Sequence, residues 1–249
     1  MEIKANIKEK PISVTMSKAL EMTKEWASKN IELAYQNENS NFSNILMLAI
    51  IDCFAQAQYN YPPPNKSKDA FREFVLCHSH KHGKALSEVC PVTLHYDYFD
   101  PNNDKELSLV PGRLYLYNDA DLVALANTLI SQLPEHMRKD AIKRHQYIEL
   151  LYKLRSKLVH ELNPLGTQVE LVSNYPAIVQ GENYYTKKSQ WTLRFPKDFI
   201  YDITKEVILD RIEDCSKSGT LPFPLTNEQR RCELSWYDTP IKGRQKRDS

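Results

Sequence analysis

The sequence predicts a mainly helical fold with a small β-strand region towards its C-terminal end. Apolar residues recur at helical spacing over most of the chain, whereas strand-like segments concentrate in about residues 165–195. With 249 residues and 41% hydrophobic content, the chain can bury a full core. We therefore expect a single domain over residues 1–240, with a helical body at 15–163, the β region, a closing helix at 196–216, and then a basic tail at 241–249.

Several helices are predicted from a capping residue followed by apolar positions at helical spacing. They run over about residues 15–35, 41–59 and 119–133, and a further one begins near Ser67. The helix at 41–59 is apolar nearly all round, so we expect it at the centre of a bundle. Pro91 to Phe99 alternates with aromatic residues and predicts a short strand or an extended segment. The helix at 15–35 is expected to bury one stripe made of Leu20, Trp26, Ala27, Ile31 and Ala34.

The longest predicted helix runs from about residue 138 to 162 and has the strongest pattern in the chain. Its apolar residues are spaced by 4, 3, 4 and 4 positions, which indicates one buried stripe. Pro164 and Gly166 end it, because the residue before a proline avoids helical geometry. The stripe consists of Tyr147, Leu151, Leu154, Leu158 and Leu162.

Composition excludes several classes of protein. Lys and Arg total 33 against 32 for Asp and Glu, so no global charge draws the chain to nucleic acid or membrane. The glycine-rich phosphate loops of Rossmann and P-loop folds are absent, as is an apolar run long enough for a membrane span. The start lacks the apolar core of a signal peptide, and the five cysteines lack C-x-x-C spacing. We expect a cytoplasmic protein without disulfides, cofactor or membrane contact.

One chemically suggestive feature is the segment LYKLRSKLVHELN at 151–163, which contains Arg155 and His160. Arginine offers a fixed positive fork for phosphate, and histidine exchanges protons near neutral pH. RNA cleavage without a metal needs these two properties. At about 100° per residue, however, the two positions lie roughly 140° apart on a straight helix. They can serve one site only if the helix end loosens or a second subunit meets it.

Neighbouring residues admit both functional and structural interpretations. Ser156 is four residues before His160, so its hydroxyl could orient the imidazole. In the structural interpretation, Arg155 lies at the edge of the buried stripe and pairs with an acid, and His160 caps the last turn of the helix. Lys157 and Glu161 are then an ordinary surface pair at positions i and i+4.

The segment LYKLRSKLVHELN resembles the signature of the HEPN family, an arginine and a histidine separated by four to six residues near the end of a bundle helix. The preceding apolar helix NILMLAIIDCFAQAQY also resembles that bundle, and the likeness covers about residues 15–163. The resemblance implies a homodimer with a metal-independent ribonuclease site where the copies meet, with Arg155 and His160 as its residues. It also implies toxin, phage-defence or RNA-processing settings, hence a possible antitoxin or defence-system partner. Ser156 departs from the family pattern, in which Asn, Asp or His usually follows the arginine.

Asp52 is a third candidate for the same site, since it stands alone in an otherwise apolar helix. A buried carboxylate is rarely left unpaired, and Arg155 is its most economical partner. The pair is either part of the catalytic site or a structural ion pair, and the sequence leaves both readings open.

Two further clusters carry weaker signals. His78, His80 and His82 could bind a metal, although loose histidine-rich loops are usually solvated. Aromatic and cationic residues alternate around Trp191, as in an RNA-binding strand pair or in a strand with one buried aromatic face. The lysines expected to contact RNA are Lys153, Lys157, Lys187 and Lys188.

The leading hypothesis is a homodimeric HEPN-like endoribonuclease in which Arg155 stabilises the phosphate and His160 acts as general acid or base, supported by Ser156 and Asp52. The second is a non-catalytic helical interaction module of the same type. The third is a metal-dependent hydrolase that uses the histidines at 78 to 82.

Overall fold

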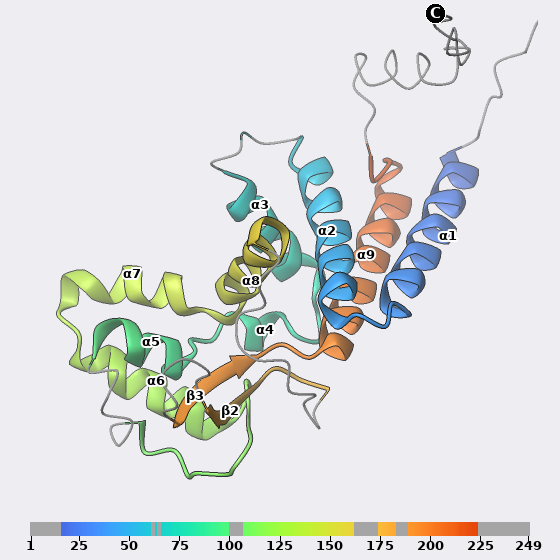
Figure 1. The fold of residues 1–249 in the computed structure, drawn as a ribbon. Coiled ribbons are helices and arrows are strands. Elements are labelled where there is room, and N and C mark those ends of the chain that lie inside the picture. The colour runs from blue at the N-terminus through green and yellow to red at the C-terminus, as the bar shows by residue number, and fades with distance from the viewer. Residues whose placement is uncertain are drawn as a thin grey trace, which may run out of the picture.

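The computed structural model describes residues 16–60, 63, 66–99, 107–161, 174–182 and 189–223, which form a mainly helical fold with one three-stranded sheet (Figure 1). The elements in chain order are α1 (Met16–Tyr35), α2 (Ser40–Gln58), α3 (Ser67–His78), α4 (Gly83–Leu86), α5 (Pro91–Tyr98), β1 (Tyr115–Leu116), α6 (Ala120–Gln132), α7 (Glu135–His145), α8 (Tyr147–Glu161), β2 (Ala177–Glu182), β3 (Ser189–Arg194) and α9 (Lys197–Ser218).

Helix α2 occupies the centre of the larger helical group, as its composition predicted. It packs against α1 and α9 on one side and against α3 and α8 on the other (Figure 1). The side-chain oxygen of Asn39 caps its start by accepting from the backbone N–H groups of Asn41 and Phe42, at 3.0 and 3.3 Å. Within the described ranges, no helix is long and apolar enough to cross a membrane.

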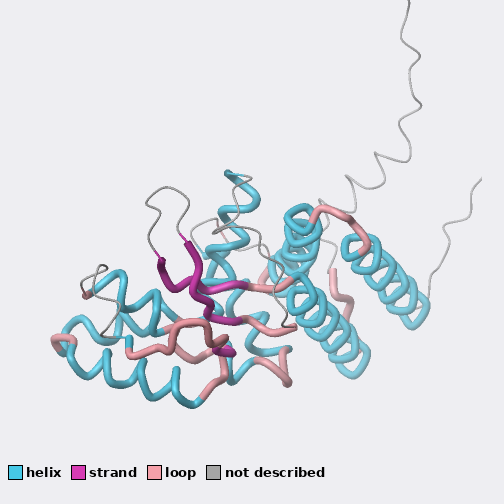
Figure 2. Tube along the Cα trace, turned by 60° about the horizontal axis from the view of Figure 1, so that its bottom comes forward, coloured by secondary structure: helices cyan, strands magenta, loops and turns pink. Residues whose placement is uncertain are grey.

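The sheet lies between this group and a second one made of α5, α6 and α7 (Figure 2). Its order is β1-β2-β3 with antiparallel pairing, and Tyr115 is opposite Ile178 while Ala177 is opposite Arg194. The sequence predicted strands only in the segment that follows the long helix. Strand β1 precedes α8 in the chain, so this prediction is wrong for β1. The closing helix is confirmed as α9, which ends at Gly219 with a left-handed φ of 65°.

The segment from Pro91 was predicted to be extended, and that prediction is wrong: it forms helix α5. Proline suits the first position of a helix, because its fixed φ is helical and the N–H that it lacks would have no partner there. Cys90 is extended and begins the helix. Val92, Leu94 and His95 are buried, so the aromatic alternation of the segment does not report a sheet face.

The predicted helix of residues 138–162 is in fact two helices, α7 and α8, separated at Gln146. This residue is extended, with φ −60° and ψ 143°, and forms a β-bridge with Val89. The backbone N–H of Cys90 donates to the carbonyl of His145 at 2.8 Å, and that of Tyr147 donates to the carbonyl of Glu88 at 3.0 Å. Contacts from a distant segment therefore break the helix where the local sequence contains no breaker.

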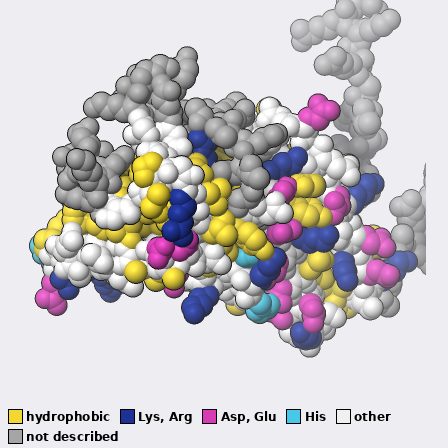
Figure 3. Space-filling view, turned by 90° about the horizontal axis from the view of Figure 1, so that it is seen from below, with side chains coloured by type: hydrophobic (Ala, Val, Ile, Leu, Met, Phe, Trp, Pro, Cys, Tyr) yellow, Lys and Arg dark blue, Asp and Glu magenta, His cyan; other side chains and the backbone are white. Residues whose placement is uncertain are grey.

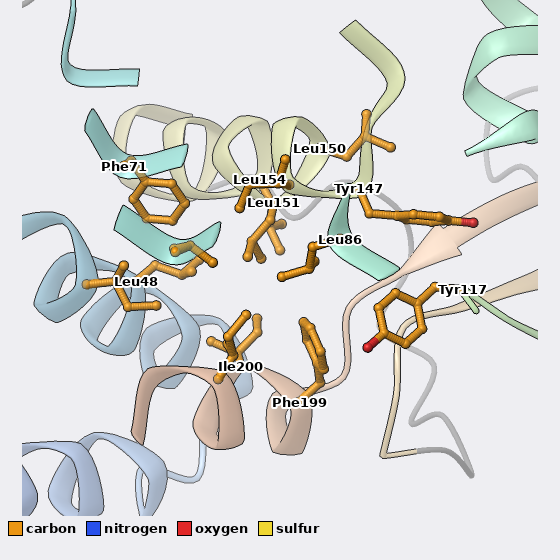
Figure 4. Close-up of a cluster of buried hydrophobic side chains, with 14 of the residues drawn as sticks. Leu48, Phe71, Leu86, Tyr117, Tyr147, Leu150, Leu151, Leu154, Phe199 and Ile200 are labelled. Atoms are coloured by element: carbon orange, nitrogen blue, oxygen red, sulfur yellow. The ribbon is translucent and has the colours of Figure 1, made fainter. Parts of the chain in front are cut away.

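The apolar stripe of α8 is confirmed over the described residues, while Leu162 lies outside them. Tyr147, Leu151, Leu154 and Leu158 are buried, and the first three meet side chains from α2, α3, α4 and α9 (Figure 4). Buried residues of all the described helices join one continuous core. One prediction for α1 is wrong: Trp26 is 49% exposed, whereas the other four residues of its stripe are buried.

His145, at the end of α7, makes the stability of this fold depend on pH. Its ring is buried, and burial lowers its pKa to about 4 although the nearby charge of Asp97 opposes the shift. Because the unfolded chain has an ordinary histidine pKa of about 6.5, it binds more protons than the folded chain between pH 4 and 6.5. The contribution of neutral His145 is complete above pH 6.5 and is lost as the pH falls towards 4.

We therefore expect the free energy of unfolding to fall by up to about 3 kcal/mol from this group over that window. Urea denaturation at several pH values should show a shallower fall for His145→Gln, whose amide can replace the contact of His145 Nδ1 with Thr93 Oγ1, at 3.1 Å. Equal slopes for the two proteins would contradict the assignment.

Candidate functional site

Asp52 and Arg155 form an ion pair between α2 and α8. Arg155 Nη2 donates to Asp52 Oδ2 at 2.5 Å, and the two side chains are 19% and 15% exposed. The contact predicted from the isolated carboxylate in α2 is therefore confirmed. Because both groups are partly open to solvent, the pair is anchored in the protein and still reaches its surface.

The surroundings of the pair hold the guanidinium in one orientation. Gln56 Nε2 donates to the other oxygen of Asp52 at 3.4 Å, and the ring of Tyr152 lies 5.9 Å from Arg155 Cζ. Arg155 Nε is buried and has no hydrogen-bond partner among the described residues.

The other two predicted catalytic residues are only partly placed. Ser156 lies on α8 and is partly exposed, while the side chain of His160 lies outside the described part of the chain. The backbone of α8 is helical through Glu161, so positions 155 and 160 keep their separation of about 140° around the axis. The alternative of a helix that loosens before residue 161 is thus removed, and a second subunit is the remaining way to bring both positions to one site.

Two of the predicted RNA-contacting lysines, Lys153 and Lys157, lie four residues apart on α8. Lys153 Nζ donates to the carbonyl of Arg144 at 3.3 Å near the end of α7, whereas Lys157 is exposed. Lys187 and Lys188 lie outside the described residues. On the face drawn in Figure 3, basic and acidic side chains alternate rather than separate into patches.

Of the aromatic and cationic residues around Trp191, the structure describes Trp191 itself and Arg194, both on β3. Trp191 is buried, and its backbone N–H donates to Tyr96 Oη at 3.0 Å, so this aromatic belongs to the core. Burial lowers the pKa of Arg194. Trp191 therefore offers no open stacking surface of the kind that RNA-binding strands use.

The histidine segment is divided between two places. His78, the last residue of α3, and His80 both meet Asp210 of α9: His78 Nδ1 is 2.8 Å from Oδ2, and His80 Nε2 is 2.9 Å from Oδ1. Asp214 lies one turn further along α9, with Oδ2 3.7 Å from His78 Nδ1. Two of the three histidines, His78 and His80, therefore meet one carboxylate of α9.

His82 does not join them. Its Nδ1 is 2.8 Å from Tyr117 Oη, and its ring packs against Phe199. Burial lowers the pKa of His82 and raises that of Tyr117 to about 12, so both groups are neutral at pH 7. His82 lines a cavity of about 260 Å³ with Lys81, Asp202, Lys205, Glu206 and Leu209.

Sequence reasoning missed the acidic residues of α9 that contact the histidine segment. Asp202, Glu206, Asp210 and Asp214 recur every four residues along α9 and so share one face. Glu206 accepts from Ser79 Oγ at 2.9 Å and from the backbone N–H of Lys81 at 2.7 Å. The spacing was visible in the sequence, but nothing in it connected that face to residues 130 positions earlier.

Comparisons of the chain with protein-family models, with curated proteins and with solved structures found no match. Membership of the HEPN family therefore stays a hypothesis that rests on the segment at 151–163 and the helical body. The function has to be argued from the residues and their geometry.

The ion pair of α2 and α8 should contribute measurably to stability. Replacing either Asp52 or Arg155 with alanine leaves the other charge partly buried without its partner, so we expect each change to lower the free energy of unfolding by about 1–3 kcal/mol. The double variant should lose less than the sum, with a coupling of about 1–2 kcal/mol in urea denaturation.

The matched control is the pair of Arg144 and Asp140 on α7, whose side chains are more than half exposed at an N–O distance of 2.7 Å. A solvated pair of this kind should show a much smaller coupling. Additive effects of the Asp52 and Arg155 substitutions would show that the contact is not energetically significant.

Proposed function

We propose that this protein is a homodimeric, metal-independent endoribonuclease of the HEPN type that acts in the cytoplasm. The observation that carries the proposal is the Asp52–Arg155 pair, because it holds a guanidinium at a partly open surface of two packed helices. A fixed arginine of this kind suits a phosphate diester, since its planar fork matches two phosphate oxygens.

The proposed reaction needs no water and no metal. The 2′-oxygen of the RNA attacks the adjacent phosphorus as its proton passes to a base, and the bond from phosphorus to the 5′-oxygen breaks as that oxygen receives a proton. The products are a 2′,3′-cyclic phosphate and a 5′-hydroxyl end. In this scheme His160 exchanges protons, Arg155 neutralises charge on the phosphorane, and Asp52 holds Arg155 while Ser156 supports His160.

In this proposal, a second copy of the chain packs on the exposed face of α2. Its exposed residues Phe42, Leu46, Ala49 and Cys53 recur at helical spacing and form one apolar stripe. Asp52 and Gln56 border this stripe, so a helix packed on it would cover the surface beside Arg155. The separation of positions 155 and 160 on α8 supports the same arrangement, because one copy alone cannot direct both side chains to one point.

The Asp52–Arg155 pair also favours a second candidate function, that of a non-catalytic interaction module. An arginine that pairs with a carboxylate at 2.5 Å can have a structural role alone, by holding α8 against α2. In that case substitution of Arg155 affects unfolding while the protein cuts no RNA. An antitoxin or defence-system protein is the class of partner that the family resemblance suggests for either function.

The catalytic proposal predicts cleavage of RNA in the presence of EDTA. We expect His160→Ala to slow cleavage by about 100-fold or more, since proton transfer by a positioned side chain contributes that much. Arg155→Lys, which keeps the charge but loses the planar fork, should also slow cleavage. The readout is the appearance of 2′,3′-cyclic phosphate ends by mass spectrometry.

The matched control for the histidine is His136→Ala on α7, where the side chain is exposed. It should cleave at the rate of the unmodified protein. Activity that needs added metal, or that survives His160→Ala, would rule out this mechanism.

The dimer is tested separately. Leu46→Glu places a charge within the α2 stripe, and we expect it to convert a particle of twice the chain mass into a monomer in light scattering. Leu33→Glu is the control, because Leu33 is exposed on α1, outside the stripe. A dimer that withstands the change at Leu46 would place the interface elsewhere, and an unmodified protein that is monomeric would remove the shared site.

A further inference from the structure

A second site, independent of the proposed ribonuclease, lies where the end of α3 meets α9. His78 Nδ1 and carboxylate oxygens of Asp210 and Asp214 lie within 4.8 Å of one another. His78 is only 2% exposed, whereas Asp214 is 48% exposed. The group is thus anchored in the protein on one side and reaches solvent on the other.

The hydrogen bond on the far side of the His78 ring determines what its Nδ1 offers. His78 Nε2 lies 2.8 Å from Gln58 Oε1, so the tautomer with its proton on Nε2 donates to this oxygen. In that tautomer Nδ1 has a lone pair on the side of Asp210 and Asp214. Nδ1 and the two carboxylates then converge as the ligands of a metal ion do.

The hydrogen bonds of Gln58 with His78 and of His80 with Asp210 resemble those that orient the ligands of metal sites. A ligating histidine usually donates its other ring N–H to an oxygen, and ligating carboxylates are themselves hydrogen-bonded. Gln58 takes the first of these roles for His78, and His80 Nε2, at 2.9 Å from Asp210 Oδ1, takes the second.

We propose that His78, Asp210 and Asp214 bind a transition-metal dication of the Zn²⁺ class and leave its fourth coordination position open to solvent. Ligands about 2.0–2.2 Å from a tetrahedral ion lie roughly 3.3–3.5 Å apart. His78 Nδ1 is 2.8 Å from Asp210 Oδ2 and 3.7 Å from Asp214 Oδ2, so modest side-chain rotations admit the ion. An imidazole ligand favours zinc and its neighbours over Mg²⁺ or Ca²⁺, which prefer oxygen alone.

The bound ion would tie the end of α3 to α9. Its binding therefore stabilises the folded chain, because the unfolded chain does not keep these three ligands together. This role is separate from RNA cleavage, which the proposed mechanism carries out without metal.

The test uses the full chain without a polyhistidine tag, after removal of metals with EDTA and dialysis. Calorimetric titration with Zn²⁺ should show one ion per chain, and a thermal melt should show a higher Tm that EDTA reverses. Asp214→Asn removes one ligand at an exposed position and keeps the size of the side chain, so we expect its Zn²⁺ affinity to fall by about tenfold or more.

Glu213→Gln is the matched control, since it removes the same charge from the neighbouring position of α9, where Glu213 pairs with Lys217. It should bind Zn²⁺ as the unmodified chain does, and circular dichroism should show that both variants fold. The proposal is overturned if the unmodified chain shows no Zn²⁺-dependent rise in Tm. It is equally overturned if Asp214→Asn binds as tightly as Glu213→Gln, because binding then belongs to other residues.

Discussion

The backbone contact between residues 88–90 and 145–147 determines how the rest of the helical body is arranged. Two backbone hydrogen bonds and the bridge of Val89 with Gln146 end α7 and begin α8 in a new direction. Only after this change of direction does the stripe that starts at Tyr147 meet α2, α3 and α9. Without it, one long helix could not keep the α7 contacts to α5 and α6 while α8 packs in the core.

The position of Arg155 follows from that packing. Leu151, Leu154 and Leu158 fix the rotation of α8 about its axis, and Arg155 then comes to the edge of the buried stripe, beside Asp52. The carboxylate of Asp52 and the guanidinium of Arg155 each offset the desolvation cost of partly burying the other charge. Stability and the proposed chemistry would draw on the same pair, so separate measurements of unfolding and of RNA cleavage are needed to tell the two proposed functions apart.

The features predicted correctly from the sequence depend on local signals or on strong chemical necessity. Helix α2 begins at a polar cap and shows its apolar composition directly, and a lone Asp52 required a cation, for which Arg155 was the nearest match. The features missed depend on distant contacts. Gln146 carries no helix-breaking chemistry of its own, and β1 has only two residues, Tyr115 and Leu116, whose pairing needs β2. The segment from Pro91 to Phe99 was predicted wrongly because its alternating aromatic residues resemble a strand, whereas Pro91 stands at the first position of a helix.

The histidine segment shows why side-chain spacing alone could not define its chemistry. His78, His80 and His82 span the end of α3 and the start of α4, so the chain turns between them, and His82 enters the core beside Tyr117. The acidic face of α9 then determines which groups the histidine segment contacts, because carboxylates four residues apart repel one another unless cationic or donor groups lie between them. Glu206 accepts from Ser79 and the backbone of Lys81, whereas Asp210 contacts both His78 and His80, and Asp214 lies 3.7 Å from His78. The contact of α3 with α9 therefore sets the surroundings of these imidazoles, and the spacing of the histidines along the chain does not reveal it.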